Sequence, residues 1–475
     1  MNRFSSKKCC SRSSRLKPGN SLDPLYKKIF RAYRPSRLNV KILSLALPVV
    51  FGMLSQSLVW ITDTVMVGYL GQNAIAAIGI GGTSYYTLVA FLIGFSMGVQ
   101  IIVARRFGEG KRSEIGKVGV STFYLSVFFG ILLSVSGLWI SELIMFWVGP
   151  EQTVNALGTE YLYYRFIGSG FYFLGFCFRG FLDGLGFTKA GFVSMAVTTL
   201  ANIFFNWIFI YGNLGVSPMG IGGAGLASSI AGLAGLLVFP IFFFYYKIGE
   251  YFEGVSLLPS IEHLKEIFKV GSPPGFEEGL VNVAFVIFSK IQGLISVLAV
   301  AASNVLFSTL SFAFLPGYAF GVAATTILGQ AMGAKKYKLA YHSAFRSAFI
   351  AAHVMGLIGL CFIFFGKWIV YAMTRDESLV EECYPVLVLL GIIQIGDAYH
   401  MVIGAALRGA GMQNYVFRIY ILLTYAVMLP SAYLFGIVWK GETLGLWTSI
   451  FVWIGSLSLI FVYEFKKKNW VKGTV

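Results

Sequence analysis

The sequence predicts an all-α polytopic membrane protein with twelve transmembrane helices in two pseudo-symmetric six-helix bundles. Of the 475 residues, 57% are hydrophobic and only 12% are charged, whereas about 25% are charged in an ordinary soluble domain. Twelve stretches are mainly apolar over the roughly 20 residues that a membrane span requires. Several unusual positions recur at an offset of 225 residues, which indicates an internal duplication. This composition excludes a soluble enzyme, a disordered protein and a nucleic-acid-binding protein.

The twelve apolar stretches define the expected elements in chain order. The first six are expected at 43–68, 75–103, 117–140, 160–182, 189–211 and 222–246. The second six are expected at 266–290, 297–329, 340–365, 384–407, 415–438 and 443–464. The chain therefore divides into a basic N-terminal tail (1–41), a first bundle (42–246), a polar linker (247–265), a second bundle (266–464) and a basic C-terminal tail (465–475).

Basic residues are distributed unevenly between the two sides of the predicted bundle. The two tails and the even-numbered connections hold 32 of the 37 Lys and Arg residues, with Arg179 and Arg408 counted among the connections. Positive residues accumulate on the cytoplasmic side and face anionic lipid there. We therefore expect both termini in the cytoplasm. No N-x-S/T glycosylation acceptor lies in an external loop, which favours a bacterial inner membrane.

The duplication indicates two halves with the same orientation. Since each half holds six spans, an axis along the membrane normal relates them. Two-lobed membrane proteins of this kind bind a substrate between the lobes and alternate its access to the two sides, so the arrangement favours a transporter. The matches at this offset are Pro48 with Pro273, Ala74–Ala77 with Ala299–Ala302, Gly108 with Gly333, and Gly184-x-Gly186 with Gly409-x-Gly411.

Polar residues inside the first bundle are candidate binding residues, because ionisable groups within spans are costly. Asp63 lies in the first helix, and Gln56 lies two turns earlier on the same face. Asn202 and Asn206 are one turn apart in the fifth helix. Alone, the asparagines are equally well explained by hydrogen bonds between helices. Together with Asp63 they offer one carboxylate and two amide oxygens, which suit a monovalent cation such as Na⁺. Asp183, at the end of the fourth helix, is either a further candidate or a solvated residue.

The second bundle carries its own set of ionisable residues. Asp397 lies midway along the tenth helix, and His400, three residues later, can share a proton with it. Either residue could instead bond to a neighbouring helix. Glu277 and Glu278 follow the proline-rich start of the seventh helix. Adjacent helical residues point about 100° apart, so we expect only one of the two to face a cavity.

Two prolines lie inside predicted helices. Pro48 is in the first helix of its bundle, and Pro273 is in the corresponding helix of the other. Proline removes one backbone hydrogen bond and permits a kink. The first helix of each bundle is therefore a candidate moving part.

Several of these segments resemble the multidrug and toxic compound extrusion (MATE) family, over about residues 41–464. The resemblance implies two bundles forming a V, and export of cationic or amphiphilic drugs in exchange for Na⁺ or H⁺. The matching segments are Ala46-Leu-Pro48, Thr62-Asp63-Thr-Val-Met-Val-Gly68, Ala104-Arg-Arg-Phe-Gly-Glu-Gly110, Arg179-Gly-Phe-Leu-Asp183-Gly, Asn202-Ile-Phe-Phe-Asn206, Leu328-Gly-Gln-Ala-Met-Gly333 and Ala406-Leu-Arg-Gly409.

The resemblance also implies roles for individual positions. Pro48 matches the proline linked to bending of the first helix, and Asp397 matches the aspartate of the second lobe in the NorM-like branch. The cation and substrate positions of the first lobe are matched by Gln56, Asp63, Asp183, Asn202 and Asn206.

The sequence departs from the family at two positions. Asn206 stands where some relatives have aspartate, which weakens a purely proton-driven first lobe. Val281 stands where the NorM-like branch has a glutamate, and Glu277 or Glu278 is a candidate replacement one turn earlier.

These observations predict a cation-coupled antiporter for amphiphilic, cationic organic compounds that functions as a monomer in the bilayer without a cofactor. The alternative within the same superfamily is a flippase for lipid-linked saccharides or an exporter of endogenous metabolites. An enzyme is disfavoured because the four histidines form no catalytic motif. A receptor or channel would not need the duplication.

Overall fold

The computed structural model describes residues 35–149 and 151–472, so most of the predicted basic N-terminal tail lies outside the described residues. The first bundle, here called the N-lobe, is built from α2–α9. Its helices are α2 (Pro35–Gly68), α3 (Gln72–Glu109), α4 (Arg112–Val148), α5 (Gln152–Ile167), α6 (Ser169–Leu185), α7 (Lys189–Phe209), α8 (Gly220–Leu236) and α9 (Val238–Tyr245). One short 3₁₀ turn follows α7, at Asn213–Gly215, and another follows α9, at Ile248–Tyr251.

The second bundle, here called the C-lobe, is built from α10–α16. Its helices are α10 (Ile261–Ile295), α11 (Val297–Gly333), α12 (Tyr337–Thr374), α13 (Glu377–Gly409), α14 (Gln413–Leu423), α15 (Leu429–Tyr433) and α16 (Glu442–Lys467). Stretches of π-helix at Thr424–Met428 and Leu434–Val438 continue α14 and α15 into one membrane crossing. A last 3₁₀ turn covers Asn469–Lys472. Helix α10 begins at Ile261, inside the stretch predicted as linker.

The twelve predicted crossings are present, but one of them is divided. Eleven of the described helical segments are long and apolar enough to span a membrane. The remaining crossing consists of α5 and α6, which have 16 and 17 residues and meet at Gly168. The hydroxyl of Ser229 from α8 accepts a hydrogen bond from the Gly168 N–H at 3.1 Å and donates one to the Tyr164 carbonyl at 2.6 Å. A side chain thus replaces one rung of the helix ladder, which breaks the helix.

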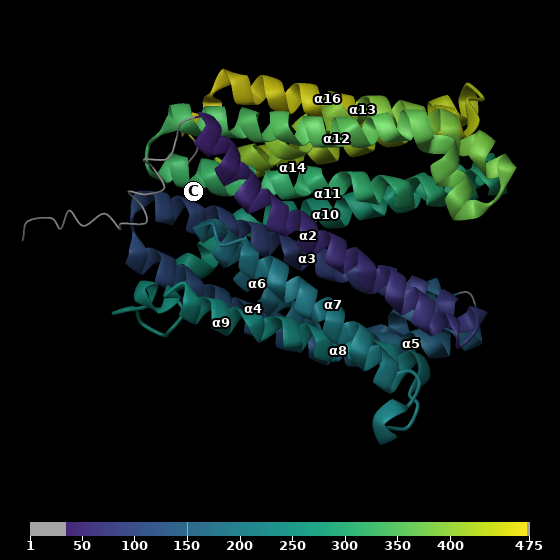
Figure 1. Ribbon diagram of the computed structural model, residues 1–475, viewed down its shortest axis with the longest axis horizontal. Helices are drawn as coiled ribbons and strands as arrows, with labels where there is room; N and C mark the ends of the chain where they lie inside the picture. The colour runs from purple at the N-terminus through teal and green to yellow at the C-terminus, as the bar shows by residue number, and fades with distance from the viewer. Residues whose placement is uncertain (1–34, 150, 473–475) are drawn as a thin grey trace, which may run out of the picture.

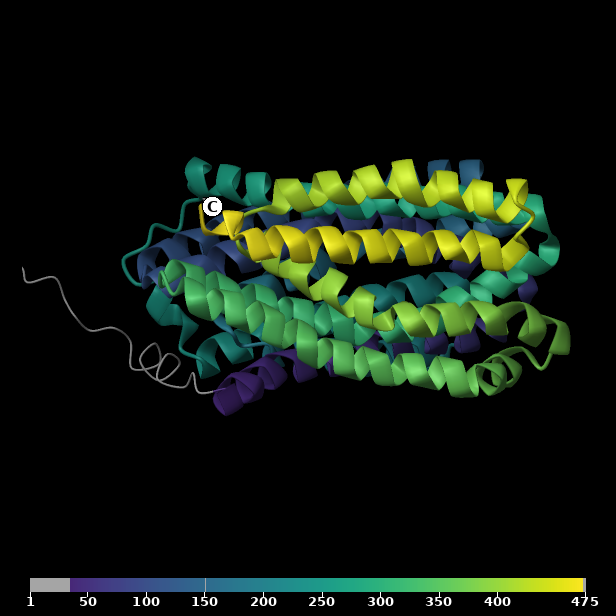
Figure 2. The same cartoon turned by 90° about the horizontal axis from the view of Figure 1, so that it is seen from above.

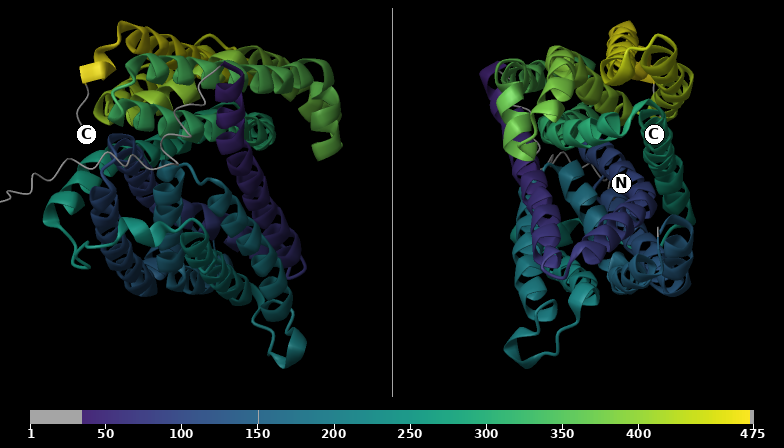
Figure 3. Two further views of the ribbon diagram at one scale, coloured as in Figure 1. Left: turned by 60° about the vertical axis from the view of Figure 1, so that its left-hand side comes forward. Right: turned by 90° about the vertical axis from the view of Figure 1, so that its right-hand side faces the viewer.

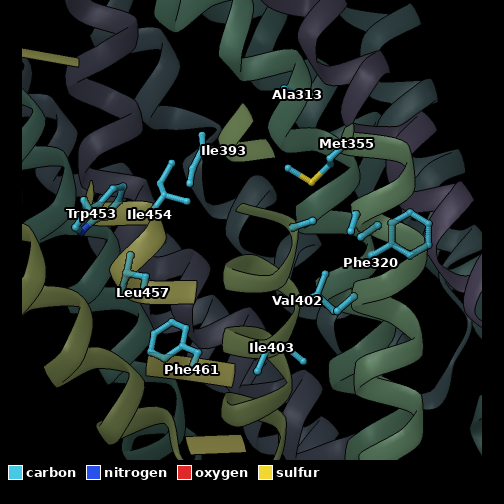
Figure 4. Packing of buried hydrophobic residues seen from close by; sticks show 14 of the residues in the cluster. Ala313, Phe320, Met355, Ile393, Val402, Ile403, Trp453, Ile454, Leu457 and Phe461 are labelled. Carbon is cyan, nitrogen blue, oxygen red and sulfur yellow. The ribbon is translucent and has the colours of Figure 1, made fainter. Parts of the chain in front are cut away.

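The two lobes lie side by side, one above the other in Figure 1, and the helices of both run roughly along the long axis of the molecule. Helices α12, α13 and α16 run alongside one another in the C-lobe (Figure 2). Its core is a single large apolar cluster, in which side chains of α11, α12, α13 and α16 interdigitate (Figure 4). Two smaller clusters form the N-lobe core, one in each half of its length. The first part of α10 contributes Ile267 and Val270 to one of them.

Helix α2 connects the two lobes. Its first half packs Ile42 and Leu45 into the C-lobe core, and its second half packs Val67 into the N-lobe core. The helix crosses diagonally from one bundle to the other (Figure 3). Pro48 lies in the interior of this helix, next to the point where Val49 contacts Ala319 of the C-lobe. Both halves of α2 are apolar, so the sequence pattern could not show which half packs into which lobe.

The lobes touch at one end of the molecule, here called the closed end. It is the end at which α3 and α11 finish and both ends of the described chain lie. Gln100 of α3 donates hydrogen bonds to the Val322 carbonyl at 3.0 Å and to Thr326 Oγ1 at 2.9 Å. Thr326 donates to the Asp183 carbonyl at 2.8 Å, and Gln330 donates to the Gly184 carbonyl at 2.9 Å.

Close backbone contacts between α3 and α10 extend from the closed end toward the middle of the molecule. A Cβ added at Gly94 would lie 2.2 Å from the backbone nitrogen of Gly275, and one added at Gly98 would lie 2.7 Å from Cα of Gly271. Helices approach this closely where small residues such as glycine lie at the crossing. The opposite end of the molecule is called the open end below.

Candidate functional site

A buried polar cluster lies between α2, α7 and α8 of the N-lobe. Asn206 donates hydrogen bonds to Asp63 Oδ1 at 2.5 Å and to Asn202 Oδ1 at 3.2 Å. Asn202 donates to Ser228 Oγ at 3.1 Å. Asp63 is 7% exposed and both asparagines are fully buried. The structure thus brings together the three residues that the sequence predicted as ligands of a cation.

The spacing on α7 explains this cluster. Residues four apart share one face of a helix, so Asn202 and Asn206 both face α2 and α8. Asn206 Oδ1 is shielded from solvent and has no hydrogen-bond partner among the described residues. The cluster therefore combines a carboxylate with amide oxygens that retain acceptor capacity. Oxygen ligands of this kind suit a hard cation.

Asp183 lies elsewhere, between the N-lobe cluster and the closed end. Its carboxylate forms an ion pair with Arg179 at 3.5 Å, and the residue is 3% exposed. The expectation that Asp183 could be solvated is wrong, because the C-lobe covers the end of α6 at this point. Arg179 lines a small cavity of about 40 Å³ together with Gln56. The charge distribution of the sequence assigns Arg179 to a cytoplasmic connection, but the residue lies inside α6.

The positively charged side chain of Arg165 lies inside the N-lobe near the break between α5 and α6. The Arg165 guanidinium lies between the rings of Tyr85 and Tyr172, 5.0 Å from each centroid. Rings on both sides stabilise a buried guanidinium through cation–π contacts. Arg165 lines a second N-lobe cavity, of about 90 Å³, together with Gln56 and Trp60.

The C-lobe contains a larger cavity, of about 320 Å³, that extends to the lobe interface. Pockets of several hundred Å³ with apolar walls and a few polar groups are typical of small-molecule sites. The walls include Phe285, Phe314, Tyr318 and Trp453, and the N-lobe contributes Gln100. The ionisable residues that line it are Glu277, Glu278, Asp397, His400 and Arg408.

Both glutamates of α10 line this cavity, whereas the sequence predicted that only one would. Glu277 is buried and forms an ion pair with Arg408 of α13. Glu278 lies beside it in a solvent-exposed position. The cavity is wide enough to receive two adjacent positions of one helix, which explains the difference. The sequence likewise assigns Arg408 to a connection, but its side chain is enclosed by the C-lobe.

A chain of hydrogen bonds runs from Asp397 to Tyr420. His400 Nδ1 lies 2.8 Å from Asp397 Oδ1, and His400 Nε2 shares a hydrogen bond with the Tyr420 hydroxyl. Both predicted environments of His400 therefore exist together, since it contacts Asp397 on its own helix and Tyr420 on α14. Asp397 is fully buried, and its Oδ2 has no hydrogen-bond partner among the described residues. The arrangement can hold a proton on either the carboxylate or the imidazole.

Sequence reasoning gave no role to Arg165, Arg179, Arg408 or Tyr420. Arg165 was visible as an isolated basic residue inside a span, which is a signal of function by itself. Arg179 and Arg408 lie near helix ends in sequence, so they resembled topology signals. Only their enclosure by the opposite helices distinguishes them.

Comparison with known proteins assigns the chain to a family. The profile of the MatE family matches residues 48–208 and 273–434. The chain belongs to the MatE family. The two matched ranges begin at Pro48 and Pro273, which confirms the duplication at the offset read from the sequence. The predicted resemblance is confirmed, and the protein is an integral membrane transporter.

Relatives of this MatE chain match along almost its whole length. It is 24% identical to the probable multidrug resistance protein NorM of Thermotoga maritima, over 94% of this chain and 97% of that protein. It is 25% identical to the multidrug resistance protein NorM of Aliivibrio fischeri, over 88% of this chain and 92% of that protein.

Solved structures confirm the fold. An outward-facing multidrug resistance MATE family transporter of the MOP superfamily has a TM-score of 0.83 and 21% identity, covering 91% of this chain and 96% of that one. A MOP superfamily transporter from Pyrococcus furiosus, described as having a binding pocket of reversed polarity, has a TM-score of 0.82 and 21% identity, with 91% and 96% covered. The predicted helical fold of two six-helix bundles is thereby confirmed.

Proposed function

We propose that this MatE transporter is a cation-coupled antiporter that exports amphiphilic, cationic organic compounds. The C-lobe cavity carries the proposal. Its three carboxylates, on Glu277, Glu278 and Asp397, outnumber its one guanidinium, on Arg408. The excess of negative charge stabilises an organic cation in this cavity, and the aromatic walls pack against the apolar part of the molecule. The NorM relatives, named as multidrug resistance proteins, support the same substrate class.

The coupling ion, Na⁺ or H⁺, is proposed to bind at Asp63 or at Asp397. Asp63 with Asn202 and Asn206 supplies the oxygen ligands that suit Na⁺. Asp397, bonded to His400, supplies a site suited to H⁺. Binding of a cation at either aspartate removes a buried negative charge, which changes the packing of the helices around it.

Alternating access is proposed to proceed by separation of the lobes at the closed end. Hydrogen bonds at that end join Gln100, Thr326 and Gln330 to the opposite lobe. Each bond is worth only about 0.5–1.5 kcal/mol net, so the contact can be exchanged for one at the open end. Pro48 is proposed as the point at which α2 bends during this movement.

The closed end is proposed to face the cytoplasm. Both described chain ends and most of the basic connections lie there, as the positive-inside tendency requires. The proposed location is a bacterial inner membrane, and the proposed functional unit is a monomer.

Efflux of a fluorescent cationic dye tests the proposal. Pump-deficient cells expressing the wild-type chain are loaded with dye and energised with or without Na⁺. The variants are Asp63→Asn and Asp397→Asn, and the matched control is Glu151→Gln, which neutralises an exposed carboxylate near the open end. We expect gradient-dependent efflux in the wild type and the control, and its loss in at least one aspartate variant.

Two results would contradict the proposal. Unchanged efflux after neutralisation of both aspartates together would remove them from the coupling mechanism. Failure of the wild type to move dye under any gradient would refute multidrug export and would favour a lipid-linked saccharide or an endogenous metabolite as the substrate.

A further inference from the structure

A shallow groove lies on the surface of the N-lobe at the point where its last membrane crossing ends. It begins at the last turn of α9 and continues along the linker toward α10. Helix α9 lies on the side of the N-lobe away from the C-lobe (Figure 1). The volume of the groove is about 530 Å³, larger than that of the two N-lobe cavities that Gln56 lines. Because a crossing meets the lipid headgroups where it ends, the groove lies at the level of the headgroups.

The apolar wall of this groove is aromatic and firmly packed. Phe243 of α9 and Phe252 of the linker both line it, and both pack against Phe181 of α6, with ring centroids 6.1 and 6.3 Å away. A Cβ added at Gly119 of α4 would lie 2.8 Å from Cζ of Phe252, so the linker is pressed against the bundle at this point. Phe244, which also lines the groove, is 87% exposed. The groove is therefore preformed and presents apolar surface to the bilayer.

Charged side chains of both signs line the same groove. They are Lys247, Glu250 and Glu253, and all three are exposed. Glu250 pairs with Arg112 of α4 at 3.6 Å. Lys247 and Glu253 form no ion pair with each other or with any other residue within 35–149 and 151–472. One ammonium group and one carboxylate thus remain available beside the apolar wall.

We propose that this groove binds a zwitterionic phospholipid whose headgroup ends in a primary ammonium, as in phosphatidylethanolamine. Lys247 pairs with the phosphate of the lipid, and the Glu253 carboxylate accepts hydrogen bonds from its ammonium group. The acyl chains pack against Phe243 and Phe244, which buries apolar surface on both sides. Each charge of the headgroup thereby meets an opposite charge of the groove.

Other common phospholipids fit the groove less well. Phosphatidylcholine carries a quaternary ammonium without N–H groups, so it cannot donate a hydrogen bond to Glu253. Phosphatidylglycerol carries the phosphate without a cation, so Glu250 and Glu253 face a negative charge that they repel. This lipid site goes beyond the proposed function, and binding there requires neither a gradient nor transport.

Photo-crosslinking with competition tests the site. Phosphatidylethanolamine with a diazirine in one acyl chain is added to the purified full-length protein in detergent and activated by light. Mass spectrometry then measures the labelling of residues 238–253. Unlabelled phosphatidylethanolamine, phosphatidylcholine and phosphatidylglycerol with identical chains compete for the site. We expect labelling of this segment, and displacement by phosphatidylethanolamine at about fivefold lower concentration than by the other two, as one ionic contact at a bilayer surface predicts.

Two variants separate the roles of the two charges. Glu253→Gln should remove the preference for phosphatidylethanolamine over phosphatidylcholine while labelling persists. Lys247→Met should weaken all three lipids about fivefold, because each of them carries the phosphate. Both side chains are exposed, so neither substitution disturbs the core. The matched controls are Glu262→Gln and Lys265→Met, which remove exposed charges of the same types from the start of α10, outside the groove, and should change nothing.

Each remaining outcome would overturn the proposal. Equal displacement by phosphatidylethanolamine and phosphatidylcholine in the wild type, or unchanged competition in both Glu253→Gln and Lys247→Met, would exclude recognition of the headgroup by these residues. Stronger displacement by phosphatidylglycerol would indicate an anionic lipid held by Lys247 alone. Absence of label from residues 238–253 would exclude a lipid and leave a protein partner as the occupant. Failure of dye export with labelling intact would contradict the transport proposal alone.

Discussion

A methyl group added at Gly94 should shift the protein away from the conformation described here. Gly94 of α3 faces Gly275 of α10 near the middle of both helices, about 22 Å from the closed end at 1.5 Å per residue. The added Cβ would lie 2.2 Å from the backbone nitrogen and 2.4 Å from Cα of Gly275. Non-bonded contacts between heavy atoms are favourable at about 3.5 Å, so the two backbones must move apart by about 1.3 Å. Because the obstacle is backbone, no side-chain rotation can relieve it.

The size of the effect follows from the cost of overpacking. Forcing extra methyl groups into a tight contact costs about 1–3 kcal/mol. A conformation in which the closed end has separated does not bear this cost. The population of the conformation with the closed end in contact, relative to the conformation with that end separated, should therefore fall by about fivefold to about 150-fold. The range follows because 1.4 kcal/mol corresponds to a factor of ten.

Distances between the lobes report this shift. Spin labels are placed at Leu214→Cys and Trp439→Cys, which lie at the open end of the two lobes and are 70% and 66% exposed. The natural cysteines are replaced beforehand. Gly94→Ala should move the distance distribution measured by double electron–electron resonance to shorter values. The matched control is Gly79→Ala on the same helix, where an added Cβ meets nothing within 4 Å.

The control determines how the result is interpreted. If Gly94→Ala and Gly79→Ala give the same distribution as the wild type, backbone contact does not hold the closed end and the reasoning fails. A shift in both variants would assign the effect to helix propensity rather than to the interface.

Three further outcomes are expected from other contacts. Glu277→Gln should destabilise the protein by about 3–5 kcal/mol because it leaves Arg408 buried without its counter-charge, and adding Arg408→Met should restore most of the thermal stability in detergent. A double variant no more stable than the single one would contradict this account. Trp447→Phe removes the hydrogen bond from its indole nitrogen to Ser303 Oγ at 3.0 Å, so the free energy of unfolding should fall by about 1–3 kcal/mol, measured by denaturant unfolding against the neutral exchange Trp139→Phe on the exposed face. Thr326→Val keeps the shape of the side chain but removes two hydrogen bonds across the closed end, worth together about 1–3 kcal/mol, so a shift in the same direction as that of Gly94→Ala is expected in the same distance measurement.

The ionisable residues show how far sequence reasoning extended into the site. Asp63, Asn202 and Asn206 could be grouped in advance because two of them share a helix face and few polar residues exist inside the spans. The contact of Asp397 with His400 followed from helical spacing. The pairing of Glu277 with Arg408 could not be foreseen, since it joins positions 131 residues apart on helices whose rotation about their axes is set by packing.

The sequence by itself determined the number of crossings, the division into two similar halves and the family. Apolar length and the 225-residue offset are properties of the chain alone, so they survive any arrangement of the helices. Only the tertiary structure decided that Ser229 breaks the fourth crossing at Gly168, that α2 belongs to both lobes, and that Arg165 and Arg408 lie in cavities of opposite charge. In a membrane almost every helix face is apolar, so hydrophobic pattern cannot orient the helices. Their orientation comes from close glycine contacts and buried polar pairs between segments distant in sequence.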